Sequence, residues 1–361
     1  MSSGGISRRL VNFCNAILGW MPGGLGVVAV FACMLFGALS GSPTATCAAI
    51  GSIMVPSMIE AGYSKRFSLA TVAVAGILGC IIPPSTVMVS YSSVSDASVG
   101  SMFMGGILPG ILMGLAMAVI PIQYGIKHQA EIPRIKFSLR NLGKSTVDAI
   151  GALLMPIIIL GGIYGGIFTP TEAAAIAIIY SVPVGFFIYK QLTMKKLYHT
   201  FVETASTTGV IMVMIFCVMM LSRIYIMEDM PGMISDFLRS FSDDKTIILL
   251  GVNIVILIMG MIMDDTSCLL LGTPILLPVV QSFGVDPIHF AAIMGVNVAI
   301  GLLTPPTAPA LYFGIQVTKT PLSAMLKPNM ILLVTCWLPT LIAVTYFPDL
   351  ALWLPRLVLG N

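Results

Sequence analysis

Long apolar runs separated by short polar breaks dominate this chain. Several runs approach the ~20 residues that cross a bilayer as a helix. They lie at 67–91, 101–122, 149–167, 173–189, 200–227, 290–317 and 323–346. Two pairs of shorter apolar arms, 24–39 with 44–59 and 247–263 with 266–280, flank polar clusters. Each pair predicts a re-entrant helical hairpin with a polar tip instead of two full spans.

Amphipathic stretches and one basic loop divide the chain further. Residues 6–20 and 231–241 have apolar and polar faces at helical spacing, which is typical of helices lying in the membrane interface. The predicted organisation is an interfacial arm helix (1–22), a first transport region (23–126: hairpin 24–60, broken helix 67–95, helix 100–123), a cytoplasmic loop (127–146), scaffold helices (147–227), a second arm helix (228–243), a second transport region (244–346: hairpin 246–283, broken helix 288–317, helix 321–346) and a C-terminal tail (347–361).

The helix breakers of the two transport regions repeat at one constant offset, without a gap. The matched residues are Thr44 and Thr266, Pro56 and Pro278, Gly62 and Gly284, Gly79 and Gly301, and Pro83-Pro84 and Pro305-Pro306. Breakers inside apolar sequence unwind membrane helices, and matched broken helices in two halves point to a transport site.

Composition supports a membrane protein. The chain is 57% hydrophobic and 9% charged, whereas soluble domains carry roughly 25% charged residues. The net charge of +3 gives no reason to expect nucleic acid as a partner. The seven cysteines lie singly in apolar runs, and the three histidines form no pair at metal-ligand spacing, so no transition-metal site is predicted.

The basic residues predict the orientation of the halves. With the loop at 127–144 in the cytoplasm, all but four of the 18 Lys and Arg residues fall on the cytoplasmic side. The four exceptions are Arg223, Arg239, Lys245 and Arg356. The first hairpin then enters from the cytoplasm and the second from the opposite side. The predicted fold is an all-α polytopic membrane protein with an inverted repeat, two re-entrant hairpins and two broken transmembrane helices.

The two halves are unequal in one respect. The spans at 147–227 precede the second interfacial helix, whereas only residues 1–5 precede the first. If the halves are true repeats, the first lacks its scaffold helices, which we expect either to be lost or to come from another polypeptide.

The tips and breaks supply the candidate ion ligands. A re-entrant turn leaves carbonyl and amide groups unpaired, and a bound cation satisfies the carbonyls. Hard oxygen ligands suit Na⁺. The candidate Na⁺-binding residues are Ser40, Gly41, Ser42, Thr44, Gly79, Pro83, Asp264, Thr266, Gly301, Thr304 and Pro306. A polar turn and a simple proline kink are the alternatives.

A second set of polar residues is the candidate substrate site. It consists of Ser42, Ser85, Asp265, Asn297 and Thr307. Adjacent carboxylates in apolar sequence are costly, so Asp264 and Asp265 are expected to ligate a cation or carry a proton, with a water-exposed loop as the alternative. Asn297 either binds a ligand or satisfies packing. Glu172 is expected to cap a helix, and Arg223 to snorkel to the interface.

At these residues the chain resembles a known family. The segments GALSGSPTAT (37–46), IIPPS (81–85), GLLTPP (301–306) and the stretch from Pro278 to Phe290 are similar to the large membrane subunit of tripartite ATP-independent periplasmic (TRAP) transporters. The resemblance covers essentially the whole chain.

The resemblance implies an elevator-type transporter of the bacterial inner membrane, coupled to Na⁺. It also implies a small membrane subunit and an extracytoplasmic substrate-binding protein as partners, and a small organic acid anion as substrate, such as a C4-dicarboxylate, 2-oxo acid or sugar acid. No organic cofactor is implied.

Two departures from the family pattern bear on activity. Family members usually begin with further membrane helices before the point that Met1 matches, and their second tip commonly reads Asp-Pro-Thr, where this chain has Asp265 in place of the proline. The alternatives are a stand-alone Na⁺/dicarboxylate symporter, a membrane enzyme and a non-transporting remnant.

Overall fold

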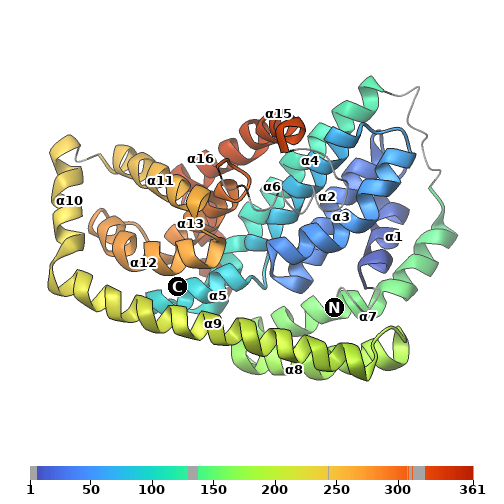
Figure 1. Cartoon of the computed structure of the whole chain (residues 1–361), viewed down its shortest axis with the longest axis horizontal. Coiled ribbons are helices and arrows are strands. Elements are labelled where there is room, and N and C mark those ends of the chain that lie inside the picture. The colour runs from blue at the N-terminus through green and yellow to red at the C-terminus, as the bar shows by residue number, and fades with distance from the viewer. Residues whose placement is uncertain are drawn as a thin grey trace.

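The computed structural model describes residues 6–128, 137–242, 244–306, 308, 311 and 322–360, and within these ranges the chain is helical without a strand (Figure 1). Among these residues, six helical stretches are long and apolar enough to cross a membrane. They are Val99–Lys127, Leu139–Tyr164, Pro170–Ile188, Met194–Met227, Lys245–Ile262 and Met325–Tyr346. The chain is therefore an all-α protein with the character of a polytopic membrane protein.

The first transport region contains a helical hairpin and an interrupted helix. Helix α1 (Ile6–Leu18) precedes α2 (Gly24–Ser40) and α3 (Pro43–Glu60), which pack against each other. The run at 67–91 is divided into α4 (Lys65–Gly76), the 3-10 turn η2 (Ile77–Cys80) and α5 (Thr86–Ser95), and α6 (Val99–Lys127) follows. Pro83-Pro84 lie in the interruption. They end the helical hydrogen bonding there, because proline lacks an amide donor.

The second transport region has the same order of elements. Helix α10 (Met230–Phe241) precedes the hairpin of α11 (Lys245–Ile262) and α12 (Asp265–Ser282), and α13 (Pro287–Gly301) ends shortly before Pro305-Pro306. The final elements are α15 (Leu322–Leu332), the π-turn η4 (Leu333–Trp337), α16 (Leu338–Tyr346) and α17 (Asp349–Leu359). Beyond Pro306, most of the broken helix predicted over 288–317 lies outside the described residues.

Matched caps begin equivalent helices in the two halves. Ser42 caps α3 and Asp264 caps α12, each accepting the N–H three residues later. Ser64 caps α4, and Asp286 occupies the matching position before α13. Because a side-chain oxygen at the N-cap satisfies one of the orphan amides, these residues fix where each helix starts.

The turns and breaks are matched as well. Gly62 and Gly284, at the bases of the two hairpins, have φ of 93° and 73°, a region that favours glycine. The peptide bonds Pro83-Pro84 and Pro305-Pro306 are both cis. The sequence repeat is thus also a repeat of local backbone structure.

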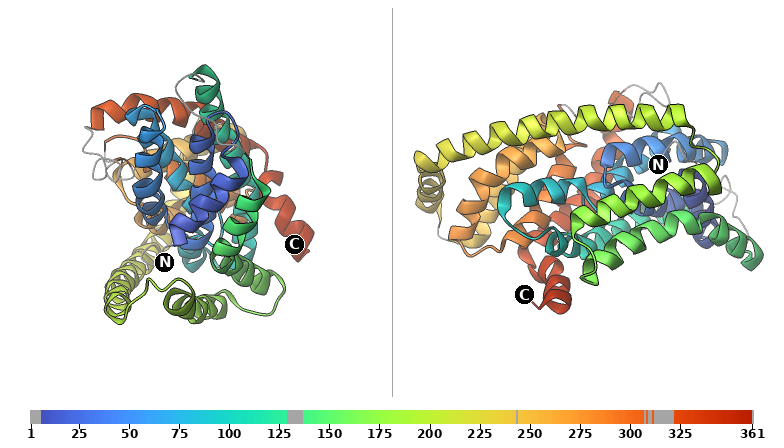
Figure 2. Two further views of the ribbon diagram at one scale, coloured as in Figure 1. Left: turned by 90° about the vertical axis from the view of Figure 1, so that its right-hand side faces the viewer. Right: turned by 90° about the horizontal axis from the view of Figure 1, so that it is seen from below.

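Three long elements connect the two regions. They are α7 (Leu139–Tyr164), α8 (Pro170–Pro183) with the π-turn η3 (Val184–Ile188), and α9 (Met194–Met227). Thr169 and Glu172 form a capping box at the start of α8, so the prediction that Glu172 is a cap is confirmed. Figure 2 shows α9 running along one side of the molecule, and its residues contact α10 and α12.

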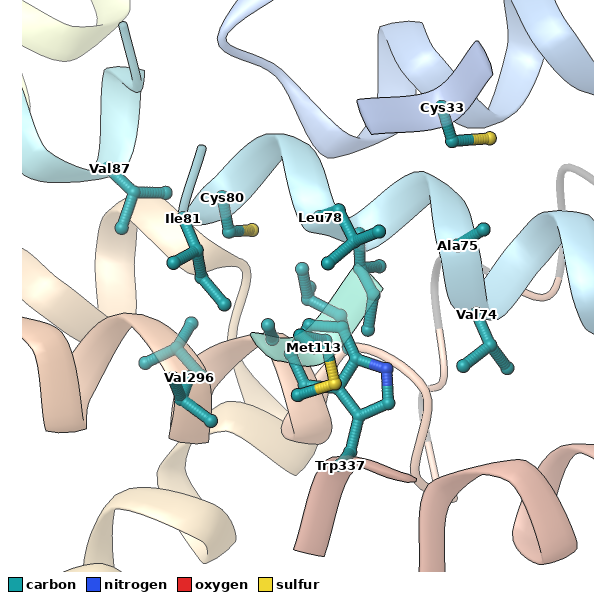
Figure 3. Close-up of a cluster of buried hydrophobic side chains, with 14 of the residues drawn as sticks. Cys33, Val74, Ala75, Leu78, Cys80, Ile81, Val87, Met113, Val296 and Trp337 are labelled. Atoms are coloured by element: carbon teal, nitrogen blue, oxygen red, sulfur yellow. The ribbon is translucent and has the colours of Figure 1, made fainter. Parts of the chain in front are cut away.

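The buried core lies where the two regions meet. Figure 3 shows Ile81 facing Val296 of α13, and Leu78 near Met113 of α6 and Trp337 of η4. All five are buried, and Trp337 is fully enclosed. Tyr91 of α5 also donates its hydroxyl to the Pro287 carbonyl (3.0 Å). These contacts join residues far apart in the sequence and hold the two interrupted helices side by side.

Candidate functional site

The first tip (residues 40–46) joins the C-terminus of α2 to the N-terminus of α3. Gly41 has φ of 62° and ends α2. Ser42 Oγ accepts the N–H of Ala45 (3.4 Å) and lies 3.0 Å from the hydroxyl of Thr44. The tip therefore places the last carbonyls of one half-helix beside the first amides of another.

Further hydroxyls converge on the same turn. Thr46 donates its hydroxyl to the Ser42 carbonyl (2.8 Å), and its Oγ1 lies 3.0 Å from Ser40 Oγ. Thr46 is completely buried, whereas Thr44 is exposed. Ser40, Ser42 and Thr44 lie together as the sequence predicts. Thr46 was missed, although its spacing of four residues from Ser42 is the usual one for a hydroxyl bonding back along a helix.

The first break is docked on this tip. A methyl group added to Gly79 would lie 3.1 Å from the Ser42 carbonyl oxygen and 3.2 Å from Thr46 Oγ1. On the other side of the break, the carbonyl of Gly41 accepts the N–H (3.1 Å) and hydroxyl (2.8 Å) of Thr86. Only glycine at position 79 permits this approach. The tip and the break thus form one unit from segments about 40 residues apart.

Because the prolines of this break lack amide donors, carbonyls of the preceding turn bond to other nearby groups. Pro83 is buried within the turn, and Ser85, also buried, donates its hydroxyl to the carbonyl of Cys80. The Ser85 hydroxyl therefore closes the break internally and lies beside the predicted cation site.

The second tip (residues 263–267) carries the two carboxylates. Asp264 is exposed and accepts both the N–H (3.3 Å) and the hydroxyl of Ser267. Asp265 is half-buried, and its Oδ1 accepts the N–H of Thr266 (3.0 Å). Carboxylates at the first turn of α12 interact favourably with the positive end of the helix dipole. The caps match in position but differ in charge, since Ser42 is neutral and Asp264 is ionisable.

The second break approaches its hairpin one turn before the tip. A methyl group on Gly301 would lie 2.5 Å from the carbonyl carbon of Gly260 in α11. Thr304 donates its hydroxyl to the Ile300 carbonyl (2.8 Å). Pro306 is exposed, and Thr307 lies outside the described residues. The Gly260–Gly301 contact was not predicted, because no local signal shows which glycine of α11 faces α13.

With this geometry in hand, comparison with known proteins is decisive. The family model for the tripartite ATP-independent periplasmic transporter, DctM component, matches residues 1–350. The chain belongs to this family.

Its relatives within the DctM family are permeases. The C4-dicarboxylate TRAP transporter large permease protein DctM of Pseudomonas aeruginosa is 42% identical over 361 residues, covering 99% of this chain and 83% of that protein. The sialic acid TRAP transporter large permease protein SiaM of Vibrio cholerae is 36% identical over 360 residues, covering 100% and 84%.

A third relative is the isethionate TRAP transporter permease protein DctMQ of Oleidesulfovibrio alaskensis, which is 40% identical over 353 residues. The alignment covers 98% of this chain but 55% of that protein, so the chain spans about half the length of that relative. DctM family membership and the six candidate spans make the chain a multi-pass protein of the bacterial inner membrane.

Asn297 of this DctM chain lies in a buried polar network. Its amide donates to the carbonyl (2.8 Å) and to Oδ1 (3.0 Å) of Asn253 in α11. Asn253 in turn donates to Thr345 Oγ1 in α16 (3.0 Å). Asn297 is completely buried, and its Oδ1 has no hydrogen-bond partner among the residues that the structure describes. The structure therefore gives the Asn297 amide group a role in packing and leaves one acceptor unused.

A cavity of about 840 Å³ runs along the outer face of α3 and reaches the first tip. Ala45 and Ser52 of α3 line one wall, and Arg8 and Asn12 of α1 line another. Helix α12 of the second hairpin contacts the long helix α9. Within the described part of the chain, α3 thus borders this cavity and α1, while α12 packs against α9.

Proposed function

We propose that this chain is the transport subunit of a Na⁺-coupled TRAP-type importer for a small organic acid. The observation that carries the proposal is the pair of matched hairpins, each packed on a broken helix through a close glycine contact: Gly79 with Ser42 at the first tip, and Gly301 with Gly260 before the second tip. Each tip carries half-helix ends together with hydroxyl or carboxylate oxygens. Such sites bind ions and anionic groups inside membrane transporters.

The charges of the side chains suggest that the two tips bind different ligands. The first tip offers neutral hydroxyls of Ser40, Ser42 and Thr44 beside the positive end of α3, which suits an anionic carboxylate as well as a cation. The second tip adds Asp264 and Asp265, which suit a cation and repel an anion. We therefore assign the stronger Na⁺ site to the second tip and the substrate carboxylate to the first.

Membership of the DctM family supports the proposal that this chain works with two partner proteins. Tripartite transporters use three components, and the relatives named large permease proteins imply a small one. We propose that a small membrane subunit enlarges the scaffold, that an extracytoplasmic binding protein delivers the substrate, and that the hairpin regions move as an elevator. The relatives' names point to C4-dicarboxylates, sialic acid and isethionate as substrate classes. A stand-alone symporter would import without added binding protein.

The first prediction concerns the caps of the two tips. We expect Ser42→Ala and Asp264→Ala each to reduce Na⁺-driven uptake at least tenfold, because each change removes a ligand oxygen. The measurement is uptake of a labelled organic acid into proteoliposomes that contain this chain, its small membrane subunit and the binding protein, under an imposed Na⁺ gradient.

Ser64→Ala and Asp286→Ala are the matched controls. They remove caps of the same chemistry, worth about 1 kcal/mol each, from the next helix of each half. We expect these variants to retain most uptake. Equal loss in tip variants and controls would assign the effect to helix stability, and wild-type uptake in both tip variants would contradict the site. A wild-type complex that is stable but shows no uptake would support the alternative that this chain is a non-transporting remnant.

A further inference from the structure

A second cavity lies between α9 and both transport regions. It has a volume of about 520 Å³, and its walls come from α9, the end of α5 and Pro274 of α12. Figure 1 shows α5 and α12 together above α9, and α12 contacts both of the other helices. We call it the α9 cavity. Asp96 and Met227, at the ends of α5 and α9, are among its lining residues, and the predicted orientation places these helix ends on the extracytoplasmic side.

One cation faces this cavity. Arg223 is exposed and lies in the last two turns of α9, a helix that is otherwise apolar over most of its length. In the part of the chain that the structure describes, its guanidinium has no ion pair or hydrogen bond. Ser222 lines the same cavity beside it, while Val218 and Met219 supply an apolar floor. An unpaired guanidinium beside a hydroxyl is suited to bind a carboxylate through two parallel hydrogen bonds.

One anion faces the same space. Asp96 ends α5 with φ of 55°, is exposed, and lines the cavity together with Ser93. Among the described residues its carboxylate likewise has no bonded partner, and it lies beyond ion-pair distance of Arg223. The two charges therefore do not neutralise each other, and both are available to a ligand placed between them.

We propose that the α9 cavity is a capture site for a hydroxylated monocarboxylate on the extracytoplasmic face. Arg223 binds the carboxylate, Asp96 accepts hydrogen bonds from the ligand's hydroxyls, and the apolar wall covers its carbon chain. A second carboxylate would face Asp96 and be repelled, so the site disfavours dicarboxylates. This inference rests on the proposed organic-acid import, but it concerns a site separate from the two tips.

Binding to the purified full chain tests the proposal, with gluconate and succinate as probes and thermal unfolding in detergent as the readout. We expect gluconate to raise the unfolding temperature with a dependence on concentration that gives a Kd, and succinate to bind more weakly. Arg223→Gln should weaken gluconate binding at least tenfold, and Arg223→Lys should lie between this variant and the wild type. Asp96→Asn should reduce the preference for gluconate over succinate.

Arg356→Gln is the matched control, because Arg356 lies on the same predicted face in α17, away from the cavity. It should bind gluconate as the wild type does. Equal gluconate affinity in wild type and Arg223→Gln, tighter binding of succinate by the wild type, or no gluconate binding by the wild type would each overturn the proposal. Gluconate binding that persists in Ser42→Ala or Asp264→Ala would separate this site from the transport site, so failure of one does not imply failure of the other.

Discussion

At the scale of single residues, close contacts between glycines set the geometry of both candidate sites. Gly79 and Gly301 occupy equivalent positions, and each faces backbone of its own hairpin. Gly79 contacts the Ser42 carbonyl of the tip and also Gly37, which precedes the tip. Gly301 contacts Gly260, also before its tip. Both breaks therefore approach a glycine near the end of the first helix of the hairpin, and the first break also reaches the tip.

Gly301→Ala tests the importance of this approach. The added methyl would lie 2.5–2.7 Å from backbone atoms of Gly260, so the two helices must separate. We expect a loss of about 1–3 kcal/mol of stability, as for overpacked cores, measured by tryptophan fluorescence during thermal unfolding in detergent. Gly209→Ala in α9 is the control, since a methyl there meets nothing within 4 Å. An unfolding temperature equal to that of wild type for Gly301→Ala would contradict the contact.

At the scale of helices, caps and polar networks decide where elements begin and how they pair. The network of Asn253, Asn297 and Thr345 joins α11, α13 and α16 inside the second region. The positions that the repeat matches to Asn253 and Asn297 in the first region are Phe31 and Ala75, which are apolar. At these matched positions the second region thus has directional hydrogen bonds where the first has apolar packing.

Asn297→Ala tests this network. The change leaves Oδ1 of Asn253 without its donor, and a buried unsatisfied polar group costs about 1–3 kcal/mol. We expect a lower unfolding temperature, together with an unchanged apparent KM for the transported acid in the variant that folds. Asn141→Ala, at an exposed position of α7, is the control. A raised KM without loss of stability would instead assign Asn297 to the substrate site.

At the scale of the whole molecule, the two hairpins are related by sequence and by local structure. Both hairpins have the same order of elements, and the charge distribution predicts that they enter from opposite sides. The long α9 lies against α12 and α10, while α3 lines the large cavity beside α1. The two halves are therefore related by their local structure but differ in what surrounds them.

Labelling of single cysteines tests the inverted orientation. Glu60 and Gln281 are exposed at the last turns of α3 and α12. In a Cys217→Ser background, which removes the exposed thiol, we expect Glu60→Cys to react with a membrane-impermeant maleimide from the cytoplasmic side only, and Gln281→Cys from the opposite side only. Reaction of both from one side would indicate a parallel repeat.

The sequence alone determined the features that depend on local chemistry. Pro83-Pro84 and Pro305-Pro306 interrupt helices because proline has no amide donor, and Ser42 and Asp264 start helices because their side chains bind free amides. The apolar runs and the low share of charged residues indicated a membrane protein. These effects act over a few residues, so they can be recognised without knowing what lies nearby in space.

Only the tertiary structure decided which distant residues meet. It places Gly260 against Gly301, gives the amide of Asn297 to Asn253, and puts Arg223 in a cavity with Asp96, a residue on another helix. The sequence predicted that Arg223 snorkels, because it lies near the end of an apolar span. What an arginine faces depends on how whole helices pack, and that packing is set by the sum of many contacts that no local pattern records.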